Sequence, residues 1–240
     1  MLYLKCVYFI CMGDVSTIML SLSLRYISEV FLYEYYMKPD EYEISSEDLA
    51  RPHLDKAGLL LEDEKNNEAL QEYLAASMEN PVSFEAISGI IICCKRLGDI
   101  EGEYKYTQEM YNICCTRAEL AVYYRNLGWY YLEKYKPYLS AALYRYSTFF
   151  QEGQAAEDEI RYLETALNKP MGKETPEQIQ KILEDNNIPT GPSSITLALL
   201  IKAGEEAEQK GNFMQAVDCY MMVYDLTEDE EIGERIKMLG

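Results

Sequence analysis

The chain has 240 residues, with 22 basic and 41 acidic side chains and a formal net charge of -19 at pH 7. Hydrophobic residues make up 48% and charged residues 26%, which is typical of a globular protein and excludes a largely disordered chain. The acidity argues against nucleic acid and anionic membranes as partners, because both attract a basic surface. The single histidine, His53, excludes a metal cluster built from histidines.

The first 37 residues contain apolar stretches that single charges interrupt. Lys5, Asp14 and Arg25 break the run, and the longest uncharged part, Val15 to Leu24, is shorter than the ~20 apolar residues of a membrane span. We therefore expect no membrane-spanning helix. A secretory signal peptide stays an alternative, since Lys5 precedes the apolar residues 6–13, although the flanks fit that pattern poorly.

Apolar residues recur three or four positions apart between Ser16 and Tyr36, which predicts an amphipathic helix. The apolar positions are Leu20, Leu24, Ile27, Phe31 and Tyr35. The opening segment Leu2–Met12 is rich in β-branched and aromatic residues and fits a helix or a strand; we favour a helix that packs on the first of the helical hairpins that follow. Residues 1–44 are thus expected to form an apolar helical cap or extension.

Seven cysteines, an odd number, favour a reducing compartment and a cytoplasmic protein. The adjacent pairs Cys93-Cys94 and Cys114-Cys115 raise the question of a zinc site. If residues 83–96 and 100–115 form an antiparallel hairpin, Cys93 and Cys114 lie ~15 Å apart along its axis, whereas Zn–S bonds measure ~2.3 Å. We predict buried thiols, no metal and no other cofactor.

Beyond residue 44 nearly every segment has the pattern of a helix, and helix breakers divide the chain at short intervals. The breakers are Asn80-Pro81, Gly98-Asp99, Lys136-Pro137, Lys169-Pro170 and the segment Asn187 to Pro192. The sequence therefore predicts an all-α chain of consecutive helical hairpins.

Several residues have the chemistry of helix N-caps, which accept hydrogen bonds from the free N–H groups of the first turn. Ser45 with Asp48, Asn67 and Asp99 are the expected caps. The run Thr175-Pro176-Glu177-Gln178 has the composition of a capping box with proline at the first helical position.

One spacing of small and aromatic residues recurs three times, with offsets of nine, four and three positions. It links Leu60, Ala69, Tyr73 and Ala76; Tyr131, Ser140, Tyr144 and Ser147; and Ala207, Ala216, Tyr220 and Val223. Small residues also stand on the preceding helices, at Ala57, Gly128 and Gly204. Because small side chains let two helices approach and the aromatic ring fills the next turn, the spacing predicts closely packed helix pairs.

These residues resemble the tetratricopeptide repeat family, whose ~34-residue unit is a pair of antiparallel helices. The match is fullest at Tyr124, Leu127-Gly128, Tyr131, Ser140, Tyr144 and Ser147. The resemblance implies a repeat domain over residues 45–240, with clear repeats at about 50–83, 121–154 and 197–230 and degenerate ones at about 84–118 and 153–190. In the first degenerate unit, Glu103 and Thr107 stand where the pattern has a small and an aromatic residue.

The resemblance implies a right-handed α–α superhelix whose concave groove is lined by the first helix of each repeat. It also implies a non-enzymatic protein–protein interaction scaffold that binds a peptide or helix of a partner in that groove. Some members hold a C-terminal carboxylate with Lys, Arg and Asn on successive first helices. Here Arg125, Asn126 and Trp129 are the candidate contact residues, while the other clear repeats offer Arg51 with Asp55 and Lys202 with Glu205, so a full cationic clamp is absent.

Half of the 22 tyrosines lie between Tyr104 and Tyr146. Packing between helices accounts for most of them, and we assign three or four to a ligand-facing surface. The chain has no glycine-rich phosphate loop, no HExxH and no GxSxG, so we do not expect an enzyme.

Two further functions stay open. The chain could act as a regulatory or assembly subunit that forms a homodimer through its apolar N-terminal segment. It could also be a peptide-sensing regulator, although the sequence contains no separate DNA-reading helix-turn-helix.

Overall fold

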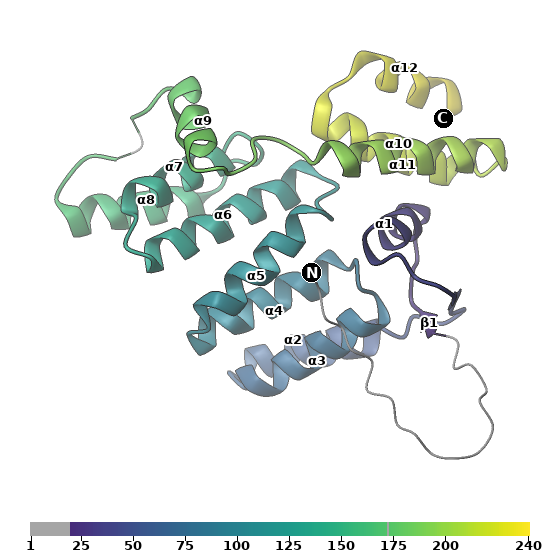
Figure 1. The fold of residues 1–240 in the computed structure, drawn as a ribbon, viewed down its shortest axis with the longest axis horizontal. Coiled ribbons are helices and arrows are strands. Elements are labelled where there is room, and N and C mark those ends of the chain that lie inside the picture. Colours follow the sequence, from purple (N-terminus) through teal and green to yellow (C-terminus); the bar gives the residue numbers. More distant parts are fainter. Residues whose placement is uncertain (1–19, 172) are drawn as a thin grey trace.

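The computed structural model describes residues 20–171 and 173–240. The expectations for Leu2–Met12, Cys6 and Cys11 lie outside the described residues. In the described part the fold is all-α, as predicted: twelve helices are joined by short connections and accompanied by two three-residue strands (Figure 1). None of the helices in these ranges is both long and apolar enough to cross a membrane.

Consecutive helices pack as pairs, which confirms the predicted succession of helical hairpins. The pairs are α2 (Arg51–Glu62) with α3 (Asn66–Glu79), α4 (Phe84–Leu97) with α5 (Ile100–Tyr111), α6 (Arg117–Glu133) with α7 (Pro137–Ser147), and α10 (Ser194–Gln209) with α11 (Phe213–Thr227). The first three pairs also pack on one another, because α3 contacts α4 and α5 contacts α6. Helices α2 to α7 therefore form one continuous stack.

The pairing changes after α7. Helices α8 (Gln154–Leu167) and α9 (Pro176–Asp185) both pack on α7, and the connection that follows leads the chain across α6. The Tyr124 hydroxyl holds this connection: it donates to the carbonyl of Pro189 at 2.9 Å and accepts from the N–H of Gly191 at 3.0 Å. Helices α10 to α12 consequently begin at a new position beside the stack (Figure 1).

The helix α1 (Ile27–Met37) packs on α10, and α12 (Glu230–Leu239) packs on α11. Phe31 of α1 lies in a small cluster with Ala203 of α10 and Cys219 of α11. Leu32 and Tyr33 join the central apolar cluster, which also contains residues of α4, α6 and α10. The helix α1 thus lies between the stack and the C-terminal helices.

The predicted helix from Ser16 to Tyr36 is shorter than expected, because it begins at Ile27. The Glu29 carboxylate accepts hydrogen bonds from the N–H groups of Arg25 at 2.6 Å and Tyr26 at 3.1 Å, which closes the start of the helix. Before it, Leu20–Leu22 forms the strand β1, which pairs in parallel with β2 (Tyr42–Ile44) beyond the helix. The N–H of Ser23 donates to the carbonyl of Glu79 at 2.7 Å and ties this unit to α3.

The predicted caps have mixed outcomes. Gly98 ends α4 at a φ of 73°, and the carboxylate of Asp99 accepts from the N–H of Gly102 at 2.9 Å to start α5. Thr175 and Gln178 form the expected capping box of α9. The Asn67 cap was wrong, because α3 begins at Asn66 without a side-chain cap. The cap at Ser45 and Asp48 was correct in part: α2 begins only at Arg51, but the Asp48 carboxylate accepts from the N–H of Arg51 at 3.0 Å.

The small and aromatic residues of the repeated spacing lie inside the helix pairs. All are buried except Tyr131, which is half-buried: Ala57, Ala69, Tyr73, Ala76, Gly128, Ser140, Tyr144, Gly204, Ala216 and Tyr220. The Tyr144 ring lies against Gly128, and the Tyr220 ring lies against Gly204. The cysteines in the described residues are free and buried, and burial raises the pKa of each thiol, so they pack as small apolar groups.

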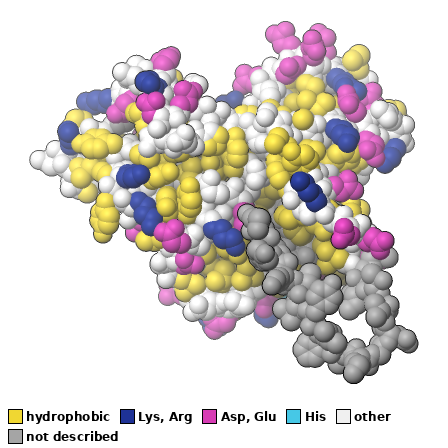
Figure 2. All heavy atoms as spheres, viewed as in Figure 1, with side chains coloured by type: hydrophobic (Ala, Val, Ile, Leu, Met, Phe, Trp, Pro, Cys, Tyr) yellow, Lys and Arg dark blue, Asp and Glu magenta, His cyan; other side chains and the backbone are white. Residues whose placement is uncertain are grey.

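Charge is distributed unevenly over the surface. In the view of Figure 2, acidic side chains gather over α12 at the upper right and over α9 at the upper left, and apolar side chains cover much of the middle. The candidate contact residues Arg125, Asn126 and Trp129 lie on α6, within the stack.

Candidate functional site

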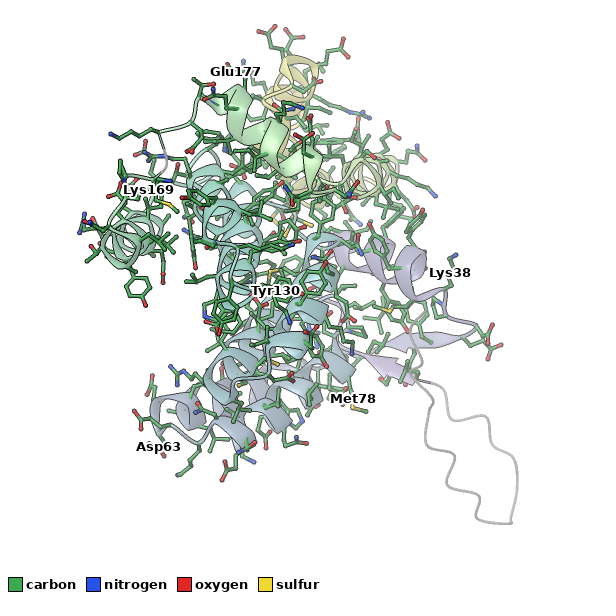
Figure 3. All side chains as sticks on the ribbon, turned by 60° about the vertical axis from the view of Figure 1, so that its left-hand side comes forward. Lys38, Asp63, Met78, Tyr130, Lys169 and Glu177 are labelled. Atoms are coloured by element: carbon green, nitrogen blue, oxygen red, sulfur yellow. The ribbon has the colours of Figure 1, made fainter. Side chains whose placement is uncertain are left out.

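The candidate contact residues Arg125, Asn126 and Trp129 lie on α6. A capping box of Thr116 and Glu119 fixes the start of this helix. Arg125 and Trp129 are four positions apart and therefore lie on the same helical face. Figure 3 places Tyr130, the next residue along, near the middle of the molecule, with Asp63 below it and Lys169 at the upper left.

The structure adds Lys95, from the last turn of α4, to this face. Its Nζ donates to Oδ1 of Asn126 at 2.7 Å and lies 5.2 Å from the centre of the Trp129 ring. The Lys95 side chain is 23% exposed, so its ammonium lies at the base of the face and is still reached by solvent. We refer to Lys95, Arg125, Asn126 and Trp129 as the Trp129 face.

Beneath this face lie the two residues that depart from the repeat pattern, Glu103 and Thr107 of α5. Both are fully buried. The Thr107 hydroxyl donates to Oε1 of Glu103 at 3.0 Å, and Nζ of Lys95 lies 3.9 Å from the same oxygen. The other carboxylate oxygen, Oε2, is buried and has no hydrogen-bond partner among the described residues. The degenerate repeat therefore contains a polar cluster in place of the small–aromatic contact.

Burial shifts the pKa values of Glu103 and Lys95 in opposite directions, and in each case it favours the neutral form. It raises the pKa of Glu103 to about 7, although the nearby Lys95 ammonium and the Thr107 hydroxyl act in the opposite sense. It lowers the pKa of Lys95 to about 8, although the carboxylates of Glu103 and Glu159 favour the charged form. Both groups therefore change charge near neutral pH, which is a property of functional sites more often than of ordinary surface pairs.

Arg125 is a cation without a matching anion. Its Nη2 donates to the amide oxygen of Gln151 at 3.2 Å, and no carboxylate of the described residues lies within ion-pair distance of it. Burial lowers the pKa of its guanidinium. Because the chain has 41 acidic residues and 22 basic ones, an arginine that is partly desolvated and lacks a carboxylate is unusual in this molecule.

The charged residues expected on the other first helices are already engaged. Arg51 pairs with Asp55 at 3.4 Å and also with Glu85. The ammonium of Lys202 lies 5.5 Å from the centre of the Phe31 ring of α1, and Glu205 pairs with Arg235 at 3.3 Å. These residues contribute to intramolecular contacts, whereas Arg125 of α6 is bound only to the amide oxygen of Gln151.

A cavity of about 990 Å³ lies between α7, α8 and α9, and no sequence pattern predicts it. It is open to solvent and is lined by both signs of charge, including Arg145 and Lys173 with Glu152, Glu157 and Glu174. Arg145 and Glu157 pair across it at 2.9 Å. None of the residues of the Trp129 face lines this cavity, and its mixed lining defines no ligand chemistry.

The tyrosines around α6 pack mainly on one another. Tyr104 of α5 stacks on Tyr130 with 4.2 Å between ring centres, and Tyr123 and Tyr124 are fully buried. The sequence had assigned most of these rings to packing. Lys95 and Glu103 were missed as site residues, although the polar residues at degenerate repeat positions were the available indication.

Comparisons of the chain with protein-family models, with curated proteins and with solved structures found no match to any of them.

Proposed function

We propose that this protein is a non-enzymatic interaction scaffold, similar to the tetratricopeptide repeat proteins, which binds a peptide or helix of a partner protein. The partner would lie on the Trp129 face, in a concave groove lined by α2, α4 and α6 of a right-handed superhelix. The observation that carries the proposal is the partly desolvated Arg125 without a carboxylate, on the same helical face as Trp129. An acidic side chain of the partner would complete this arrangement.

The energetics favour these residues as anchors. Arg and Trp are enriched among the interface residues whose truncation costs ~2 kcal/mol or more. Asn126 and Trp129 are held in place by Lys95, so the face is formed before a partner arrives and little side-chain entropy is lost on binding. The free, buried thiols are consistent with the reducing, cytoplasmic compartment that we propose for the protein.

The test is affinity capture from the source cell's lysate with the wild type and an Arg125→Ala/Trp129→Ala variant. We expect a partner that the wild type retains and the variant loses, while circular dichroism shows the same helix content in both. The matched control is Arg161→Ala/Tyr162→Ala on α8, which also removes an arginine and an aromatic ring from exposed positions. Equal capture by both variants would remove the Trp129 face from the proposal.

A second function, self-association through the N-terminal unit, is favoured by one observation. Several apolar side chains of residues 20–44 are exposed although Phe31 and Tyr33 are buried: Leu20, Tyr26, Tyr35, Met37 and Ile44. Such a patch could bury itself against a second copy. Light scattering over a range of protein concentrations decides this, because a strict monomer at high concentration would exclude the dimer.

A further inference from the structure

We infer that Lys95 and Glu103 form a proton-dependent anion subsite of the Trp129 face, which binds an acidic side chain of the partner when Glu103 carries a proton. This inference rests on the proposed function for the nature of the partner. Its central step, the change of charge beside Trp129, concerns this chain alone and can be measured without a partner.

The geometry places a carboxylate where its charged form is poorly compensated. Glu103 is fully buried, its Oε2 has no hydrogen-bond partner in the described part of the chain, and its Oε1 lies 3.9 Å from the Lys95 ammonium. That distance is too long for a strong hydrogen bond. An ionised carboxylate in such a place is costly, and uptake of a proton relieves the cost.

Lys95 connects this buried group with the surface. Its ammonium is bound to Oδ1 of Asn126 and lies over the Trp129 ring, and its side chain is only partly covered. A proton on Glu103 therefore leaves an ammonium with hydrogen-bonding capacity at the base of the face. A carboxylate of the partner could accept from this ammonium while Trp129 covers the contact from water.

The other ionisable groups around the pair leave this interpretation intact. Lys95 faces Glu103 of α5 and Glu159 of α8. The charge of Glu103 contributes to raising the pKa of Cys94 of α4, Tyr130 of α6 and Tyr144 of α7. Burial raises the pKa of that thiol and of both phenols, so all three groups stay neutral near physiological pH.

The direction of the effect follows from the two pKa shifts. As the pH falls through neutrality, Glu103 takes up its proton while Lys95 keeps its own, and the pair changes from neutral to a net positive charge. As the pH rises, Glu103 ionises and cancels the charge of Lys95, which then loses its proton. Binding of an anion at the Trp129 face should therefore strengthen as the pH falls.

Trp129 is the only tryptophan of the chain, so its fluorescence reports the charge of the subsite directly. Quenching by iodide, an anion, is compared with quenching by the neutral acrylamide and by the caesium cation. We expect the ratio of iodide to acrylamide quenching to rise about twofold between about pH 9 and pH 6, since one unit charge close to the ring changes the local anion concentration by that order. Caesium quenching should fall over the same range.

Two variants assign the effect. Glu103→Gln preserves the shape of the side chain and leaves Lys95 as the only group of the pair that titrates. Its iodide ratio should be as high as that of the wild type at about pH 6 and change by a clearly smaller factor towards pH 9, because the pair then changes from positive to neutral and not to negative. The matched control is Glu109→Gln on the same helix, because burial also raises the pKa of Glu109, which lies 4.0 Å from Lys105; this variant should keep the pH dependence of the wild type. Lys95→Met leaves Glu103 as the only titrating group of the pair. Its ratio should lie below that of the wild type at about pH 6 and should change only at higher pH, because loss of the ammonium raises the pKa of Glu103 further; it provides a second measurement if Glu103→Gln does not fold.

A ratio that does not change with pH in the wild type, or a pH dependence in Glu103→Gln as large as that of the wild type, would overturn the inference. Because the measurement uses the full chain alone, this failure differs from a failure of the scaffold proposal. If the wild type captures no partner but its iodide ratio depends on pH as expected, the scaffold proposal is contradicted and the subsite stays in place.

Discussion

Gly204 shows how closely one residue is fitted to its neighbour. A methyl group at this position would lie 2.5 Å from Cε1 of Tyr220, well inside contact distance. The ring cannot easily move, because its hydroxyl donates to Glu208 at 3.1 Å and the guanidinium of Arg235 lies 4.6 Å from its centre. We expect Gly204→Ala to lower the free energy of unfolding by ~1–3 kcal/mol, as measured by urea titration.

The control is Gly58→Ala in α2. A methyl group there meets no atom within 4 Å, so only the backbone entropy of the unfolded chain changes. Gly58→Ala should raise the free energy of unfolding by ~0.5–1 kcal/mol. If both substitutions change it in the same direction, the packing explanation of the repeated glycine–tyrosine spacing fails.

Lys95→Met should destabilise the protein in a pH-dependent manner. When the Lys95 ammonium is absent, the pKa of Glu103 rises further above its value in the unfolded chain. The native state therefore binds more protons than the unfolded state over a wider pH range. The free energy of unfolding then falls as the pH rises, by ~1.4 kcal/mol for each unit of added pKa shift. The loss relative to the wild type should therefore grow between about pH 6 and pH 9 in denaturant titrations.

Adding Glu103→Gln to Lys95→Met should remove this growth, because no buried carboxylate is then left to ionise. If Lys95→Met loses the same free energy of unfolding, relative to the wild type, at about pH 6 and at about pH 9, the cause of the loss is packing and not charge.

At the residue scale the sequence identified part of the candidate site. Asn126 and Trp129 could be chosen because α6 matches the repeat pattern well. Lys95 and Glu103 could not, since the contacts between them join different helices, and the pattern assigns no role to a lysine in the last turn of α4. A buried carboxylate is recognisable only when its surroundings are known.

Among the helices, α1 has the most unusual place, between the stack and α10. Phe31 fills a cluster with Ala203 and Cys219, and Tyr36 lies 3.3 Å from the hydroxyl of Thr196. Truncating a buried phenylalanine costs ~3–5 kcal/mol. We expect Phe31→Ala to lower the free energy of unfolding by an amount in this range, measured by thermal or urea unfolding.

The matched control lies on the same helix. Tyr35 is exposed, so Tyr35→Ala should change stability by ~0.5 kcal/mol or less. Comparable losses from the two variants would indicate that the helix itself, and not the contact of Phe31 with the C-terminal helices, is responsible.

Element boundaries could be predicted where the determining residues are neighbours in the sequence. Gly98 with Asp99 and Thr175 with Gln178 act within a few positions, and both ends were confirmed. The strands β1 and β2 pair across the whole of α1, and three residues each provide too little alternation for a strand to be recognised. The apolar spacing continued through Leu20 and Leu24, and it therefore extended the predicted helix too far.

For the whole molecule, the same difference between local and distant contacts decides what could be foreseen. Packing of each helix on the next was predicted, because short connections force neighbours together. The packing of α10 on α1 joins opposite parts of the chain and leaves no periodic pattern. The sequence thus predicts the stack of α2 to α7, and the position of α10 to α12 depends on contacts that only the folded structure reveals.

Two of the contacts that hold these C-terminal helices against the rest of the molecule lie far apart from each other in the sequence. One is Phe31 in its cluster with α10 and α11. The other is the guanidinium of Arg117, which lies 3.2 Å from the Glu228 carboxylate and also donates to the carbonyl of Phe149 at 2.6 Å. The backbone N–H of Arg117 donates to Asp225 at 2.7 Å, a bond that substitution of the side chain leaves in place. Since both contacts hold the same group of helices, losing one leaves the other in place.

We therefore expect Phe31→Ala/Arg117→Ala to release α10 to α12 from the stack. Hydrogen exchange should show amides of α10 and α11 exchanging at least ~10-fold faster than in either single variant, while the amides of α4 and α5 keep the protection of the single variants. Tyr35→Ala/Arg117→Ala serves as the control and should resemble Arg117→Ala. Equal acceleration in both groups of helices would mean that the chain unfolds as one cooperative unit, because local release would have affected the C-terminal helices alone.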